Sequence, residues 1–116
     1  LTQQSGLELG LSLLQMDRRP TAIVASNDLM ALGVVMAARQ LGLRVGVDVA
    51  ISGYDDTPLA AHADPPLTSV NCLVFESGRQ ACRQLIELIQ ADQPVVKQLL
   101  LQPNLVIRAS SGTSRD

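Results

Sequence analysis

The sequence contains the stretch Val49-Ala50-Ile51-Ser52-Gly53-Tyr54-Asp55-Asp56-Thr57, in which a short apolar run passes directly into a glycine and two carboxylates. The apolar run at 49–51 is typical of a buried strand. Two charged side chains at the exit of such a strand cannot belong to its core, because burying an unpaired charge is heavily penalised. We therefore expect Asp55 and Asp56 at the carboxyl edge of a sheet, where open α/β folds bind their ligands.

A second polar pair stands at the exit of a second apolar run. The pair Asn27-Asp28 follows Thr21-Ala22-Ile23-Val24-Ala25, which is short and apolar enough to indicate a central strand. Two polar strand exits within one βαβ unit predict that both open into a single ligand crevice.

Apolar periodicity and turn residues predict the elements on either side of these strands. Pro20 ends a first helix, and Gly42 fits the left-handed position that closes a second one. In order, the expected elements are a helix at 1–17, a strand at 21–25, a helix at 28–40, a strand at 48–53, a loop or short helix at 57–66, an extended run at 67–71, a helix at 75–90, and strands at 98–101 and 105–107. This alternation indicates an α/β fold with a parallel sheet and right-handed crossovers.

The composition narrows the class of protein. The chain has 116 residues, of which 47% are apolar and 17% charged, as in a globular domain with a substantial core. A net charge of −2 makes it a poor electrostatic match to a nucleic-acid backbone. The two cysteines, Cys72 and Cys82, and the single histidine, His62, lack metal-ligand spacing, so we expect reduced thiols, no metal and no cofactor.

The ends of the chain carry no targeting signal that we recognise. There is no secretion signal and no apolar run of membrane-spanning length, so we expect a cytoplasmic protein without a membrane partner. The chain begins without methionine and in the middle of a helical pattern, which suggests a piece of a longer protein.

The helix expected at 28–40 is apolar on nearly all sides. Such a helix must be covered on both sides, and the sheet covers one of them. We expect a second copy of the protein to cover the other, with the chain's own first helix as the alternative. No leucine heptad follows Ile107, so we expect a dimer at most. The predicted dimer contact comprises Leu29, Leu32, Val35, Met36, Leu59 and His62.

These motifs resemble the sugar-responsive domain of LacI/GalR-type repressors. The resemblance rests on Pro20-Thr21-Ala22, on Ala25-Ser26-Asn27-Asp28-Leu29-Met30-Ala31-Leu32-Gly33, on Leu41-Gly42-Leu43-Arg44-Val45 and on the run from Val49 to Thr57. In the same order follow Pro65-Pro66-Leu67-Thr68-Ser69-Val70, then Gly78, then Leu105-Val106-Ile107-Arg108. The resemblance covers about residues 5–110 and is greatest to the lactose repressor branch.

The resemblance implies a two-lobed, periplasmic-binding-protein-like (type I) effector domain, of which this chain looks like the C-terminal part. Residues 1–71 would form a C-terminal lobe with a βαβ core, and 72–92 a crossover segment and helix of the N-terminal lobe. Residues 93–108 would supply closing strands, and 109–116 a flexible tail. The DNA-binding helix-turn-helix would lie before Leu1.

The resemblance also suggests ligand contacts. Similar repressors use the carboxylate at the place of Asp55 to accept hydrogen bonds from ligand hydroxyls, which suits carboxylate chemistry. The alternative, a structural Asx-turn, is less favoured at a strand exit. Asn27 donates and accepts as a sugar hydroxyl requires, yet it is equally suited to cap the following helix unless Ser26 takes that role. Asp28 and Asp56 are assigned helix-dipole and turn roles.

The sequence departs from the lactose repressor branch around the expected pocket. That branch carries a glutamine and then an aromatic residue where this chain has Cys72 and Val74, and another aromatic residue at the place of Leu1. A thiol does not replace an amide and valine does not stack, so either the effector differs from a galactoside or the pocket is filled differently. Cys72 itself is most simply a small buried apolar side chain.

We therefore expect the effector-sensing and dimerising part of a transcriptional repressor. Its partners would be a small-molecule effector (a sugar), a second copy of the chain, and operator DNA reached only through an N-terminal region. The alternative is a fragment of a sugar-transport binding protein of the same fold. An enzyme is not expected, because His62 has no identifiable nucleophile beside it, and the adjacent Asp55 and Asp56 point in different directions.

Overall fold

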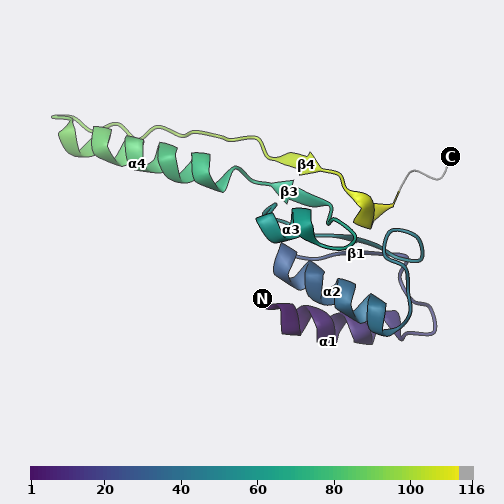
Figure 1. Cartoon of the computed structure of the whole chain (residues 1–116). Coiled ribbons are helices and arrows are strands. Elements are labelled where there is room, and N and C mark those ends of the chain that lie inside the picture. Colours follow the sequence, from purple (N-terminus) through teal and green to yellow (C-terminus); the bar gives the residue numbers. More distant parts are fainter. Residues whose placement is uncertain (113–116) are drawn as a thin grey trace.

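The computed structural model describes residues 1–112. Figure 1 shows a body formed by three helices and the short strands, from which a fourth helix and the returning chain project as an arm, residues 74–103. The molecule measures 63 × 32 × 25 Å along its principal axes. The elements are α1 (Gln3–Leu14), β1 (Ala22–Val24), α2 (Asp28–Gln40), β2 (Ala50–Ser52), α3 (Pro58–His62), β3 (Ser69–Asn71), α4 (Val74–Gln90), β4 (Asn104–Val106) and a 3-10 turn at Ala109–Ser111.

The strands of the body confirm the α/β fold. β1 pairs with β2 in parallel, with Ile23 opposite Ile51, and a parallel bridge from Ser52 to Thr68 leads on towards β3. β4 pairs with β3 antiparallel, because the chain runs outward along α4 and enters β4 from the opposite direction. The core lies between the strands and α2, and its most deeply buried large apolar side chains are Val49, Ile51 and Leu67.

Two features of the predicted strands differ from the structure. The run at 21–25 was expected to be central, but among the described residues β1 lies at the edge of the sheet, and Val24 is 82% exposed. The expected strand at 98–101 does not form, because that segment lies in the arm, where its backbone has no strand beside it within the described part of the chain. Only β4 remains of the two closing strands.

Helix α2 lies between the sheet and α1, which Figure 1 shows running alongside it. Glycines allow this close approach. A Cβ on Gly33 would collide with the backbone carbonyl of Gln3, and a Cβ on Gly6 would collide with the backbone of Met30. The chain's own first helix therefore covers the face for which we expected a second copy of the protein.

This packing corrects part of the predicted dimer contact. Val35 is 4% exposed and belongs to the core of the body, so it is not available to a partner. Leu32 is half-buried, and His62 is exposed at the end of α3, with its Nδ1 2.7 Å from the carbonyl oxygen of Pro58. Leu29, Met36 and Leu59 are 43%, 41% and 58% exposed, so a contact through these three residues stays a prediction.

The apolar side chains of the arm are exposed to solvent. α4 buries none of its residues, although its apolar positions follow the helical periodicity that the sequence predicts. Phe75 is 85% exposed, and Leu100 on the returning chain is 90% exposed. Hydrogen bonds from Arg79 and Gln80 lower the pKa of the Glu76 carboxyl to about 2. The assignment of 72–92 to another lobe stays a prediction, and the projection of this segment away from the body supports it.

The end of the described chain is more ordered than its composition predicts. Instead of a loose tail from residue 109, Ala109–Ser111 form a 3-10 turn in which Ser110 is fully buried. The Ser110 hydroxyl donates to the carbonyl of Ile51 at 2.6 Å and accepts from the amide of Thr68 at 2.8 Å. The remainder of the expected tail, 113–116, lies outside the described residues.

Candidate functional site

The loops that leave β1 and β2 are joined by backbone hydrogen bonds at the carboxyl edge of the sheet. The amide of Ala25 donates to the carbonyl of Ser52 at 2.8 Å, and the amide of Asp28 donates to the carbonyl of Tyr54 at 2.9 Å. Asn27 and Asp55 are therefore the sequence neighbours of a hydrogen-bonded pair, Asp28 and Tyr54. The structure brings both predicted ligand residues to one edge of the sheet.

Asp55 presents a nearly unengaged carboxylate at this edge. Its backbone amide donates to the carbonyl of Val70 at 3.0 Å, and its φ is +105°. Among residues 1–112, the carboxylate has one long contact, from the Cys72 thiol at 3.8 Å, and it accepts no loop amide. The Asx-turn alternative is thus not realised, and the carboxylate oxygens of this exposed side chain are available to an external donor.

Asn27 is the N-cap of α2. Its Oδ1 accepts a hydrogen bond from the amide of Met30 at 2.8 Å, which settles the helix-cap role that the sequence left open. The Ser26 hydroxyl does not take that role and contacts the sulfur of Met30 instead. Because capping occupies only the side-chain oxygen, the Asn27 Nδ2 group keeps its capacity to donate a hydrogen bond.

Asp28 does more than its expected helix-dipole role. Its side chain is 1% exposed, and it accepts hydrogen bonds from the Thr57 amide at 2.7 Å and the Thr57 hydroxyl at 2.9 Å. A third bond comes from the Ser69 hydroxyl at 2.6 Å. A Cβ at Gly53 would collide with the Asp28 carboxylate, so glycine is required there. These hydrogen bonds connect the start of α2 to the turn after β2.

Asp56 holds the same turn from its other side. Its amide donates to the Ser69 hydroxyl at 3.0 Å. Its carboxylate accepts from Arg108 at 2.7 Å and from the Asn71 side chain at 3.0 Å. The turn role predicted for Asp56 agrees with these contacts, but Arg108 and Ser69 were not identified from the sequence. Arg108 appeared there only as part of a family-like motif, which carried no indication of its partner.

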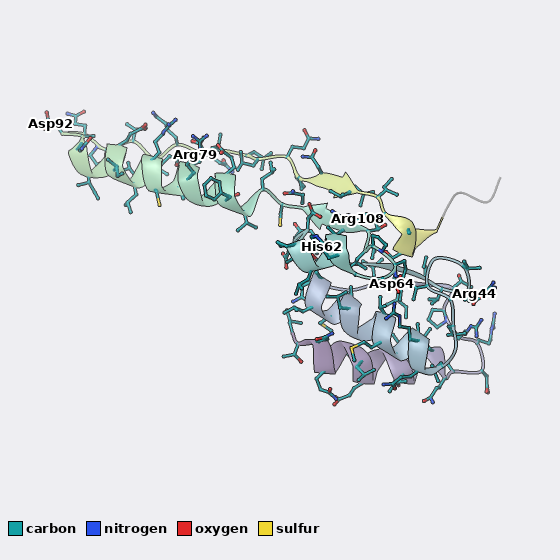
Figure 2. All side chains as sticks on the ribbon, viewed as in Figure 1. Arg44, His62, Asp64, Arg79, Asp92 and Arg108 are labelled. Atoms are coloured by element: carbon teal, nitrogen blue, oxygen red, sulfur yellow. The ribbon has the colours of Figure 1, made fainter. Side chains whose placement is uncertain are left out.

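A hollow of about 540 Å³ lies mainly between α4 and the returning chain of the arm, and Tyr54 and Cys72 line its end next to the body. Figure 2 shows where these parts meet: Arg79 and Asp92 lie on the arm, and Arg108 lies where the returning chain joins the body. Cys72, expected to be buried, is instead half-buried at the rim, and both cysteines are unpaired thiols. The rest of the lining is mixed, and neither Asn27 nor Asp55 belongs to it: Ser77, Gln80, Ala81, Gln84, Lys97, Gln98, Leu99, Leu101 and Pro103.

Two classes of feature are absent from the part of the chain that the structure describes. No group of three His, Cys, Asp or Glu side chains gathers closely enough to hold a metal ion there. Nor does any helix within residues 1–112 have both the length and the apolar character needed to cross a lipid bilayer.

Comparison with known proteins agrees with this arrangement. Residues 2–111 match the family described as periplasmic binding protein-like domain. The chain is 45% identical over 94 residues to the HTH-type transcriptional regulator MalR of Streptomyces coelicolor, an alignment that covers 81% of this chain and 27% of that protein. The chain therefore spans about a quarter of the length of this relative.

Solved structures show the same fold. A lac repressor dimer bound to operator and the anti-inducer ONPF superposes with a TM-score of 0.88 at 35% identity, covering 97% of this chain and 39% of that one. A LacI family transcriptional regulator from Arthrobacter in complex with lactose superposes with a TM-score of 0.85 at 32% identity, covering 95% of this chain and 41% of that one.

Proposed function

Since this chain belongs to the periplasmic binding protein-like domain family, and its relatives above are LacI-type transcriptional regulators, we propose that it is the effector-sensing part of such a regulator. The effector is a sugar or a similar polyhydroxylated molecule, bound at the carboxyl edge of β1 and β2. The related structure in complex with lactose supports this class of ligand. Because the relatives reported above are transcriptional regulators, this function is favoured over that of a sugar-transport binding protein.

The observation that carries the proposal is the nearly unengaged Asp55 carboxylate, on a loop that is hydrogen-bonded to the loop of the capping Asn27. A carboxylate accepts hydrogen bonds from two neighbouring hydroxyls, and these bonds are charge-assisted. The Asn27 Nδ2 group donates to a hydroxyl or ring oxygen while its oxygen stays on the Met30 amide. Cys72 lines the hollow where the lactose repressor branch carries a glutamine, so either the effector differs from a galactoside or the pocket is filled differently.

The proposed mechanism is allosteric. In the regulator that contains this domain, sugar binding stabilises one arrangement of two lobes and thereby changes the spacing of two DNA-reading heads. The coupling is reciprocal, so operator DNA and sugar each alter the affinity of the other. This chain supplies sugar contacts and part of the dimer surface. The regulator would act in the cytoplasm, and the net charge of −2 of this chain fits DNA contacts that lie elsewhere in the regulator.

Two measurements test this function. First, the purified chain is screened for thermal stabilisation by lactose, maltose, cellobiose and ribose at millimolar concentration, because a ligand that binds only the folded state raises the melting temperature. Asp55→Asn should abolish the stabilisation, whereas Asp64→Asn, which alters an exposed ion pair with Arg39, should preserve it.

Second, the active sugar is added to the longer regulator on operator DNA while fluorescence anisotropy is recorded. We expect the affinity for DNA to change, and to stop responding in the Asp55→Asn variant. If no sugar alters DNA affinity in the wild-type regulator, the sensing function is wrong.

A further inference from the structure

The turn that presents Asp55 has an unusual backbone. Asp55 and Asp56 both have positive φ angles, of +105° and +51°, which side chains other than glycine seldom adopt. Such conformations persist only where the surrounding structure holds them in place. The position of the Asp55 carboxylate therefore depends on contacts made by its neighbours.

Backbone bonds supply part of this hold. The amide of Asp55 donates to the carbonyl of Val70, and the amide of Asp56 donates to the hydroxyl of Ser69. Both acceptors lie on β3, so the turn is hydrogen-bonded to that strand. The next residue, Thr57, is bonded to the Asp28 carboxylate, and the Asp56 side chain makes the other side-chain contacts of the turn.

The Arg108 guanidinium, together with the Asn71 side chain, holds the Asp56 carboxylate. Its Nη2 donates to the Asp56 carboxylate at 2.7 Å, and its Nη1 donates to the carbonyl of Leu67 at 2.8 Å. The side chains of Arg108 and Asp56 are 19% and 13% exposed, so the pair is largely shielded from water. The Arg108 amide is itself fixed by the Thr68 hydroxyl at 2.8 Å. Donating to both acceptors at once requires the planar guanidinium group with its several N–H donors. The single ammonium group of lysine does not match this geometry.

We propose that Arg108 is a positioning residue for the sugar site, which acts through Asp56 to hold the Asp55 carboxylate in its binding orientation. This inference rests on the proposed function of Asp55. Arg108 directly follows β4, where the arm returns to the body, so the same ion pair ties the returning chain to the ligand turn.

Hydrogen exchange in the sugar-free chain tests the positioning role. The variants are Arg108→Met, Arg108→Lys and Asp56→Asn, with Arg39→Met as the control, because Arg39 forms an exposed ion pair with Asp64. In Arg108→Met, protection of the amides at 55–57 should fall by about tenfold relative to those of α2, the loss expected when one partner of a shielded charge-assisted bond is removed. Arg108→Lys should retain part of this protection, and Arg39→Met all of it.

Two exchange results would overturn the inference. Either protection at 55–57 stays unchanged in Arg108→Met, or it falls equally throughout the body, which is the behaviour of a residue that only stabilises the fold. Normalising each variant to the amides of α2 separates these outcomes from a general loss of stability.

A sugar titration distinguishes failure of the inference from failure of the proposed function. With the sugar that stabilises the wild-type chain, Arg108→Met should bind about tenfold more weakly, and Arg108→Lys should recover part of the loss. Wild-type affinity in Arg108→Met would overturn the positioning role while leaving Asp55 as a ligand residue. If no sugar alters the DNA affinity of the wild-type regulator, the proposed function fails, whereas the exchange data still decide whether Arg108 holds the turn.

Discussion

Asp28 and Thr57 are joined twice: the buried carboxylate of Asp28 accepts both the backbone amide and the side-chain hydroxyl of Thr57, at 2.7 and 2.9 Å. The first residue of α2 is thereby bonded to the residue that closes the turn after β2. These bonds and the contacts of Asp56 anchor the chain after the exposed Asp55, and the bond from the Asp28 amide to the Tyr54 carbonyl anchors it before that residue. The turn is held rigidly at its ends and open to solvent at Asp55.

Replacing Asp28 should therefore destabilise the body. In Asp28→Ala, Thr57 and Ser69 lose their shared acceptor, and we expect the free energy of unfolding to fall by about 3 kcal/mol, as for the loss of buried hydrogen bonds to a charged group. Urea unfolding measures the change. Asp64→Ala, an exposed carboxylate, serves as the control and should alter stability by less than about 0.5 kcal/mol.

The two roles of Asn27 can be separated by substitution. Asn27→Ala removes the bond to the Met30 amide and should cost about 1 kcal/mol of stability. Asn27→Ser retains a capping oxygen and should keep nearly wild-type stability, but it lacks the amide donor and should weaken sugar binding as Asn27→Ala does. Urea unfolding and sugar titration of both variants decide the matter. Wild-type sugar affinity in Asn27→Ser would remove Asn27 from the ligand site.

Two glycines offer a matched test of helix packing. Gly33→Ala places a Cβ against the backbone carbonyl of Gln3 and should cost roughly 1–3 kcal/mol, because α1 must move away from α2. Gly78→Ala in α4 meets nothing within 4 Å and should stabilise that helix by about 0.5–1 kcal/mol. Hydrogen exchange of the two helices measures both effects. Equal tolerance of the two substitutions would contradict the close packing of α1 on α2.

The residues of the predicted dimer contact now separate into two groups. Leu59→Glu and Met36→Glu alter exposed side chains and should convert a dimer into folded monomers in sedimentation experiments. Val35→Glu places a charge in the core and should instead unfold the body. Leu9→Glu, on the exposed face of α1, is the control and should leave the dimer intact. Dimers that survive both Leu59→Glu and Met36→Glu would rule out this surface.

Local signals in the sequence were sufficient for much of the fold. Helix α2 begins and ends where predicted, because Asn27 supplies a cap and Gly42 adopts the left-handed φ of +70° expected after its end. The two polar strand exits do meet at one edge, since parallel strands bring their carboxyl ends together. Periodicity also located α4 within one residue of its start.

Contacts between distant parts of the chain could not be predicted in the same way. Arg108 and Asp56 are far apart in sequence, and neither residue type indicates the other as its partner. Ser110 lies in a run whose serine and glycine content suggests a loose tail, yet its hydroxyl is bonded to two backbone groups of the sheet. Apolarity alone did not show whether α1 or another chain covers α2, because both would bury the same face.

The central claim is that a sugar binds at the edge formed by Asn27 and Asp55. Its most direct test is a titration of the isotope-labelled chain with lactose, maltose, cellobiose and ribose, followed by the backbone amide signals in NMR spectra. We predict that one of these sugars shifts the signals at 26–28 and 53–57 together, and that Asp55→Asn removes those shifts while preserving the folded spectrum. Shifts confined to other surfaces, or the same shifts in Asp55→Asn, would contradict the account.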